Sequence, residues 1–124
     1  MDELQSLWID AMRHPLGLRV HVRGTATYEN TAAYWRAILR HLRLTGARKL
    51  LLVDELEGDG LSEPEWLGVV MQIAGTGPEQ VRIAHVKPAG ADDFAWYELF
   101  VRDVGYEAKM FDSEDAAERW LREA

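Results

Sequence analysis

An acidic stretch after the apolar run Leu50–Val53 holds the side chains best suited to chemistry. Its carboxylates are closely spaced, and no lysine or arginine occurs from residue 50 to residue 81. Asp54, Glu57 and Asp59 could converge on a hard cation such as Mg²⁺ or Ca²⁺, which takes oxygen ligands. However, their spacing does not fit the EF-hand loop, and the dipole of a following helix favours carboxylates without any metal. A solvated acidic loop is the favoured interpretation, and no metal is expected.

A basic cluster precedes this stretch. Arg36, Arg40 and Arg43 stand at i, i+4 and i+7, which places them on one face of a helix. No acidic residue occurs from residue 30 to residue 53. Such a face could bind an acidic partner or a phosphate, although a solvated face is the commoner outcome. Contact between this face and the acidic stretch of another subunit is a further alternative.

Motifs for catalysis or cofactor binding are missing from the sequence. It contains no His-Glu-x-x-His, Gly-x-Ser-x-Gly, Walker or dinucleotide-binding pattern. With no cysteine, thiolate chemistry and cysteine-based zinc sites are excluded. Four histidines lack metal-ligand spacing: His14, His21, His41 and His85. We therefore expect no catalytic residue and no cofactor, and an enzyme of unknown class is the least favoured hypothesis.

Length and composition favour one globular domain spanning residues 1–124, with 48% hydrophobic and 28% charged residues. The net charge of −7 argues against nucleic acid as a main partner, because phosphates must be neutralised by positive charge. No apolar run approaches the ~20 residues of a membrane span, and the N-terminal residues lack the features of a secretory signal. A cytoplasmic location is predicted.

Hydrophobic spacing divides the chain into alternating strands and helices. Two opening strands, Leu4–Asp10 and Leu18–Arg23, predict a hairpin, because apolar and polar residues alternate along the second. The stripe Trp35, Ile38, Leu39 and Leu42 predicts a helix over Tyr28–Thr45 that ends at Gly46. The unbroken apolar run Leu50–Val53 is typical of a central strand that helices cover on both faces.

The second half continues the pattern. Ser62 and Glu65 have capping-box spacing, which predicts a helix that begins at Ser62 and ends at Gly75–Pro78. The remaining predicted elements are a strand over Val81–Val86, a helix over Asp92–Val104, a strand over Glu107–Phe111 and a helix over Glu114–Arg122. The order β-β-α-β-α-β-α-β-α predicts an α/β fold with a mixed, mostly parallel sheet and an antiparallel edge strand.

This order also indicates where a ligand would bind. In open parallel sheets, ligands gather beyond the carboxyl ends of the strands, and the acidic stretch follows such an end. We therefore expect any site to lie between this stretch, the segment Lys87–Asp93 and Tyr28. The aromatic-rich segment Asp92–Val104 is interpreted as core packing, with a second apolar face for a partner or an apolar ligand as the alternative.

Five stretches carry a resemblance to a known family: Gly24–Thr27, Tyr34–Trp35, Gly46–Asp54, Gly105–Glu107 and Phe111–Leu121. In order and spacing they resemble the SpoIIAA-like proteins, a bacterial branch of the STAS fold with some similarity to lipid-binding CRAL-TRIO domains. The resemblance covers nearly the whole chain and implies a single-domain STAS-like fold. It carries no catalytic signature.

The best-understood members of that family, the anti-anti-sigma factors, are controlled by phosphorylation of a serine in an Asp-Ser-Ser or Asp-Ser-Thr motif. The corresponding stretch Asp54–Ser62 lacks this motif. Ser62 occupies a similar place at a helix start, where backbone N–H groups could accept a phosphate. The surrounding carboxylates would repel that phosphate, so a simple N-cap is the favoured role of Ser62.

Two function hypotheses follow from the resemblance. The first is a non-catalytic regulatory or protein-interaction module that binds a protein partner or itself as a homodimer. The alternative is a binding protein for a small molecule or an apolar, lipid-like ligand at the carboxyl end of the sheet. A lipid-sized cavity would consume much of the core of a chain of 124 residues, which favours the first hypothesis.

Overall fold

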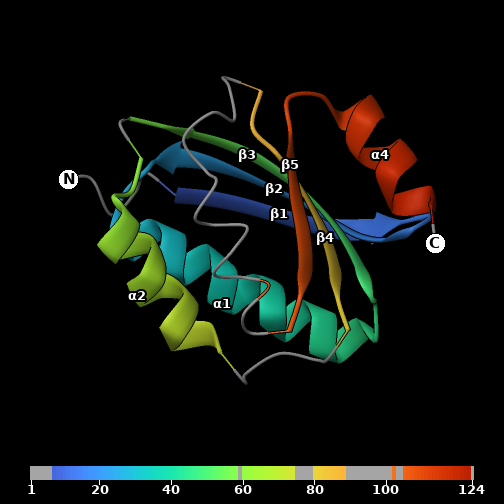
Figure 1. Ribbon diagram of the computed structural model, residues 1–124, viewed down its shortest axis with the longest axis horizontal. Helices are drawn as coiled ribbons and strands as arrows, with labels where there is room; N and C mark the ends of the chain where they lie inside the picture. The colour runs from blue at the N-terminus through green and yellow to red at the C-terminus, as the bar shows by residue number, and fades with distance from the viewer. Residues whose placement is uncertain (1–6, 59, 75–79, 89–101, 103–104, 124) are drawn as a thin grey trace.

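The structure is a computed structural model that describes residues 7–58, 60–74, 80–88, 102 and 105–123. The chain forms, in order, β1 (Leu7–His14), β2 (Gly17–Thr25), α1 (Tyr28–Thr45), β3 (Lys49–Glu57), α2 (Glu63–Ile73), β4 (Arg82–Val86), β5 (Glu107–Phe111) and α4 (Glu114–Arg122). Figure 1 shows α1 and α2 on one face of the sheet and α4 on the other. Within the described ranges, no helix combines the length and apolar character needed to span a membrane.

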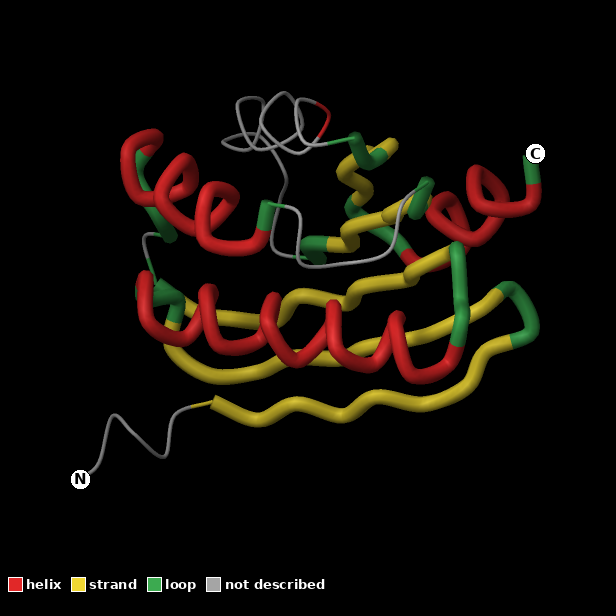
Figure 2. Tube along the Cα trace, turned by 90° about the horizontal axis from the view of Figure 1, so that it is seen from below, coloured by secondary structure: helices red, strands yellow, loops and turns green. Residues whose placement is uncertain are grey.

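The five strands lie side by side in chain order, β1-β2-β3-β4-β5. β1 is antiparallel to β2, and the other neighbouring strands are parallel. The predicted mixed sheet with an antiparallel edge strand is therefore confirmed. The connections through α1 and α2 step in the same direction along the sheet, so crossovers of one hand place both helices on one face (Figure 2).

A two-residue loop, Pro15 and Leu16, joins β1 to β2. Gly17 follows it with φ 152°, and a Cβ at this position would lie 2.3 Å from the backbone oxygen of Lys49. Only glycine fits this close approach, because no other residue leaves room for the neighbouring backbone. The turn of the hairpin therefore packs closely against the first residue of β3.

Some element boundaries differ from the sequence prediction. β3 runs to Glu57 rather than Val53, because Asp54 and Leu56 stay buried on the face under the helices. The first part of the predicted acidic loop is therefore strand. Five predicted features lie outside the described residues: the first residues of the opening strand, Asp59, the helix stop at Gly75–Pro78, residues 89–93 of the segment expected near the site, and the helix over Asp92–Val104 apart from Arg102.

The larger core lies between the sheet and the two helices α1 and α2. The predicted stripe Trp35, Ile38, Leu39 and Leu42 is fully buried against strand residues such as Leu50. Complete burial of one such side chain stabilises the fold by about 1.5–3 kcal/mol. Thr27 caps the start of α1, where its side chain accepts a hydrogen bond from the amide of Asn30, and Gly46 caps the end with φ 73°.

A smaller core lies on the opposite face, where Ala117 and Leu121 of α4 pack on Leu51 and Val53. Alternation along β3 sends its apolar side chains to both cores, as expected for a central strand. On this face of the sheet, α4 covers β3 and β4, and Phe111 of β5 packs beside it.

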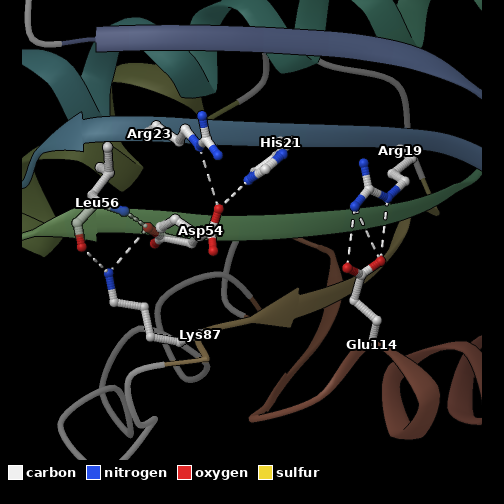
Figure 3. Close-up of polar contacts among 8 residues, drawn as sticks. Arg19, His21, Arg23, Asp54, Leu56, Lys87 and Glu114 are labelled. Atoms are coloured by element: carbon white, nitrogen blue, oxygen red, sulfur yellow. Dashed lines mark hydrogen bonds and ion pairs between the residues drawn. The ribbon is translucent and has the colours of Figure 1, made fainter.

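Polar contacts hold α4 at both ends. At its N-terminus, Glu114 forms an ion pair with Arg19 at 3.1 Å (Figure 3), and at its middle Glu118 contacts His14 at 3.0 Å. At its C-terminus, Lys49 donates to the backbone oxygen of Leu121, and the guanidinium of Arg82 lies 3.9 Å from the centre of the Trp120 ring. Positive charge at this end also interacts favourably with the helix dipole.

The capping box predicted at the start of α2 is confirmed. The hydroxyl of Ser62 accepts a hydrogen bond from the amide of Glu65 at 3.4 Å, and the carboxylate of Glu65 accepts one from the amide of Ser62 at 2.9 Å. Both partners satisfy backbone N–H groups that the helix itself leaves unbonded.

Substitution of Ser62 tests this role. Ser62→Ala removes the hydroxyl acceptor, so we expect the free energy of unfolding to fall by about 1 kcal/mol. Ser62→Asp is the matched control, because its carboxylate can accept the same bond at the positive end of the helix dipole. Chemical denaturation followed by circular dichroism measures both variants. Equal destabilisation by alanine and aspartate would contradict the capping role.

Candidate functional site

The carboxyl ends of β3 and β4 hold a cluster of buried ionisable groups. Asp54 lies in β3, His85 in β4 and Lys87 directly after β4. The parallel register pairs Leu52 with His85, so these side chains share the face of the sheet that α1 and α2 cover. Asp54 is 3% exposed and His85 is completely buried. The structure therefore places charge at the edge of the main core.

Asp54 is the centre of this cluster. Its Oδ2 lies 2.8 Å from Nε2 of His85, and its Oδ1 accepts hydrogen bonds from Nζ of Lys87 at 3.1 Å and from the amide of Leu56 at 3.0 Å. Nζ of Lys87 also donates to the backbone oxygen of Leu56 at 2.8 Å (Figure 3). Both carboxylate oxygens are satisfied, as a buried charge requires.

Two opposing effects set the pKa of Asp54. Burial, the largest single effect, raises the pKa because it disfavours the charged carboxylate. The hydrogen bond from His85 and the charges of His85 and Lys87, with the Leu56 amide, together outweigh burial and leave the pKa below the ordinary value. Asp54 is therefore ionised in the folded chain at neutral pH.

The chemistry open to this cluster is limited. A carboxylate beside a histidine can orient the imidazole for proton transfer, but catalysis also requires a nucleophile or substrate within reach. The ring of His85 is buried edge-on against Trp35, with 6.4 Å between ring centres. Lys87 is paired with Asp54. This geometry is that of a structural ion pair that joins the ends of β3 and β4.

The pH dependence of stability tests the ion pair. Because the folded pKa of Asp54 lies below the unperturbed 3.8, its stabilising contribution is complete above the unfolded pKa and is lost as pH falls through the folded pKa. Asp54→Asn leaves Lys87 without its counter-charge, so we expect a loss of about 3 kcal/mol at neutral pH. The difference between wild type and variant should shrink below about pH 4.

Urea denaturation between about pH 2 and pH 7 measures this difference, with the exposed Asp112→Asn as a control for removal of a surface charge. Asp112→Asn should change stability by less than about 0.5 kcal/mol. A difference for Asp54→Asn that stays constant across this pH range would rule out the charged pair.

The residues predicted for the acidic loop do not converge. Asp54 faces the helices, whereas Glu57 follows the alternation of β3 to the opposite face, where it lines a depression with Glu55 and Arg23. Ser62 caps α2. Asp59 is outside the described residues. Across the described ranges, no group of three His, Asp or Glu side chains could hold a metal ion.

Tyr28 is directed toward α2 instead of the acidic loop. Its hydroxyl is hydrogen-bonded to Nε2 of Gln72, and a Cβ added at Gly68 would lie 3.3 Å from the Tyr28 ring. The small residue at position 68 therefore permits close packing between the start of α1 and α2. The structure gives Tyr28 a role in helix packing.

The three predicted arginines do come together. Arg36, Arg40 and Arg43 line an open groove of about 440 Å³ along α1, with Ala33, Ala37, Leu39 and Gln72 completing its lining. Nη1 of Arg36 donates a hydrogen bond to Oε1 of Gln72 at 3.1 Å. Burial raises the pKa of Tyr106, and the nearby charge of Arg43 opposes that rise. In the part of the chain that the structure describes, no carboxylate forms an ion pair with any of the three.

Sequence reasoning missed the partners of Asp54. His85 stands among apolar residues of a strand that is polar elsewhere only at Arg82, and this polar residue among buried positions was the available signal. Lys87 belongs to the segment expected near the site, but its pairing with Asp54 depends on the β3–β4 register. Gln72 likewise lines the groove only because α2 packs on α1, and the sequence alone does not show this packing.

Comparison with known proteins finds no match for this sequence, either among protein-family models or among curated proteins. The SpoIIAA-like resemblance thus stays a prediction from the quoted residues. A proposed function must therefore rest on those residues and on the geometry of the described surface.

Proposed function

We propose that this chain is a SpoIIAA-like, STAS-like module without catalytic activity, and that its α1 groove binds an acidic segment of a partner protein. The observation that carries the proposal is the groove itself, where Arg36, Arg40 and Arg43 face solvent together. No carboxylate of the described chain neutralises them, although the whole chain carries a net charge of −7. Unpaired positive charge on an acidic protein favours a negatively charged partner.

The lining of the groove supports a protein segment as the occupant. A guanidinium presents a planar set of donors that can bind a carboxylate through two hydrogen bonds. Arg36 is already oriented by Gln72, which lowers the entropy lost when it binds. Ala33 and Ala37 are small, so a partner helix or strand can approach the backbone of α1 closely.

The spacing of the arginines suggests the form of the segment. Positions 36 and 43 are separated along the helix axis by about 10 Å. A partner helix with carboxylates at i, i+4 and i+7 would present negative charge at the same intervals. This mode corresponds to a helix lying in a groove, in which charge sets the register and apolar contact supplies affinity.

The proposal assigns binding to α1 rather than to Ser62. In the anti-anti-sigma factors, a serine near this position controls partner binding, but Ser62 and Glu65 here form a closed capping box. An apolar ligand at the carboxyl end of the sheet is less favoured, because the described residues there include the ion pair of Asp54 and Lys87. Burying apolar ligand against these charges would compete with their hydrogen bonds.

A synthetic helical peptide with glutamates at i, i+4 and i+7 tests the groove. Arg40→Glu should weaken its binding about tenfold, because one attractive contact becomes repulsive. Arg119→Glu makes the same change of charge on exposed α4 and should alter the dissociation constant by less than about twofold. Fluorescence anisotropy at about 50 mM and about 300 mM salt gives both the affinity and its salt dependence.

Two outcomes would contradict the proposal. The first is an equal loss of affinity in the two variants, which would show that only net charge matters. The second is the absence of binding to wild type at low salt. A peptide of the same composition with its glutamates on different helix faces should bind more weakly, since it cannot match the spacing of the arginines.

A further inference from the structure

The outer edge of β1 offers backbone groups to another strand. In the described part of the chain, β1 pairs with β2 alone. The two-residue loop makes His14 and Gly17 a hydrogen-bonded pair, and alternate residues of β1 then bond to β2. The N–H and C=O groups of Ile9, Ala11 and Arg13 consequently point away from β2. Such an edge is a template for a further strand.

Two large apolar side chains stand on the same strand. Trp8 is 47% exposed and Met12 is 48% exposed, and both lie on the face opposite α1. The ring of Trp8 is held edge-on to His21 at 5.3 Å between centres, and the guanidinium of Arg23 lies 5.4 Å from its centre. A tryptophan fixed in this way beside an arginine is typical of residues that dominate protein interfaces.

We propose that β1 pairs antiparallel with β1 of a second copy of this chain, about a twofold axis that passes through Ala11. In this register Ile9 faces Arg13 of the second copy, and Trp8 faces His14 of the second copy. The two sheets join into one of ten strands, five from each copy. The new interface lies away from the α1 groove, so the inference does not depend on the proposed function.

Charge selects this register over its neighbours. A twofold axis perpendicular to the sheet pairs residues of the same face, which allows axes only at individual residues. An axis at Asp10 would set two carboxylates directly opposite each other, which is unfavourable. An axis at Met12 would set Ile9 opposite Pro15, which has no N–H to donate. The axis at Ala11 sets Asp10 opposite Met12 of the second copy, and it places Pro15 opposite only Leu7, the first residue of β1.

In the proposed dimer, Trp8 would be buried by residues of the second copy. His14 lies at the end of β1 that is close to α4, where Glu118 contacts it at 3.0 Å. The twofold axis brings this pair from the second copy beside Trp8 and Arg23. The carboxylate of Glu118 complements the guanidinium of Arg23, whose side chain is 63% exposed. The end of β1 that carries Trp8 in one copy thus contacts the end of β1 near α4 in the other.

Analytical ultracentrifugation between about 1 and about 100 μM tests the dimer. We expect wild type to form a dimer within this range. Trp8→Ala should raise its dissociation constant at least about tenfold, because the large aromatic contact with the second copy is lost. Met71→Ala is the control, since Met71 is another exposed large apolar side chain, which lies on α2 and far from β1 in sequence and fold. It should leave the dissociation constant unchanged.

Ala11→Pro tests the backbone pairing. It removes the outward N–H at the axis but keeps the hydrogen bonds of β1 to β2, which use the alternate residues. We expect a loss of dimer at least as large as for Trp8→Ala, with the native circular dichroism spectrum retained. If this variant fails to fold, Trp8→Ala and amide exchange decide the question.

Hydrogen exchange supplies the independent measurement. The amides of Ile9, Ala11 and Arg13 should become protected as protein concentration rises, whereas those of the β1–β2 ladder should be protected throughout. A wild type that remains monomeric at about 100 μM would overturn the inference. Edge amides protected at every concentration would overturn it as well, because another part of the same chain would then cover β1.

Discussion

Burial of β3 on both faces is the constraint on which the other elements depend. Its residues from Leu50 to Asp54 are all buried, and its neighbours β2 and β4 occupy both edges. α1 and α2 bury one face of the strand, and α4 buries the other. Asp54 and Lys49 of this strand contact Lys87 and Leu121, and Gly17 of the hairpin packs against the backbone of Lys49. A shift of β3 by one residue would exchange the two cores.

The sequence predicted best those features that depend on local spacing. The α1 stripe, its stop at Gly46 and the capping box at Ser62 involve residues within a few positions of one another, and all are confirmed. The end of β3 was predicted too early, because Asp54 looked like a loop residue when its buried partners were unknown. Its contacts with His85 and Lys87 span more than thirty positions and exist only in the folded register.

Charged side chains are distributed unevenly over the molecule, and the net charge alone does not show this. The arginines of α1 lie together on the helix layer, whereas Arg19, His21 and Arg23 lie on the opposite face and contact Glu114 and Glu55. The spacing on α1 was visible in the sequence, and the open groove was not, because α2 forms part of it. The two surfaces therefore differ in character: the basic one forms no ion pair with the described carboxylates, and the other is internally paired and carries exposed apolar groups.

The agreement between strand order and chain order has a consequence for synthesis on the ribosome. Each strand from β2 to β5 adds to the free edge left by the one before, so no strand must enter between two that are already paired. Assembly can therefore proceed as the chain emerges. Leu51 and Val53 differ, because they are covered by α4, which is made only after all five strands. A nascent chain stopped before α4 exposes this apolar strip and is prone to aggregate through it.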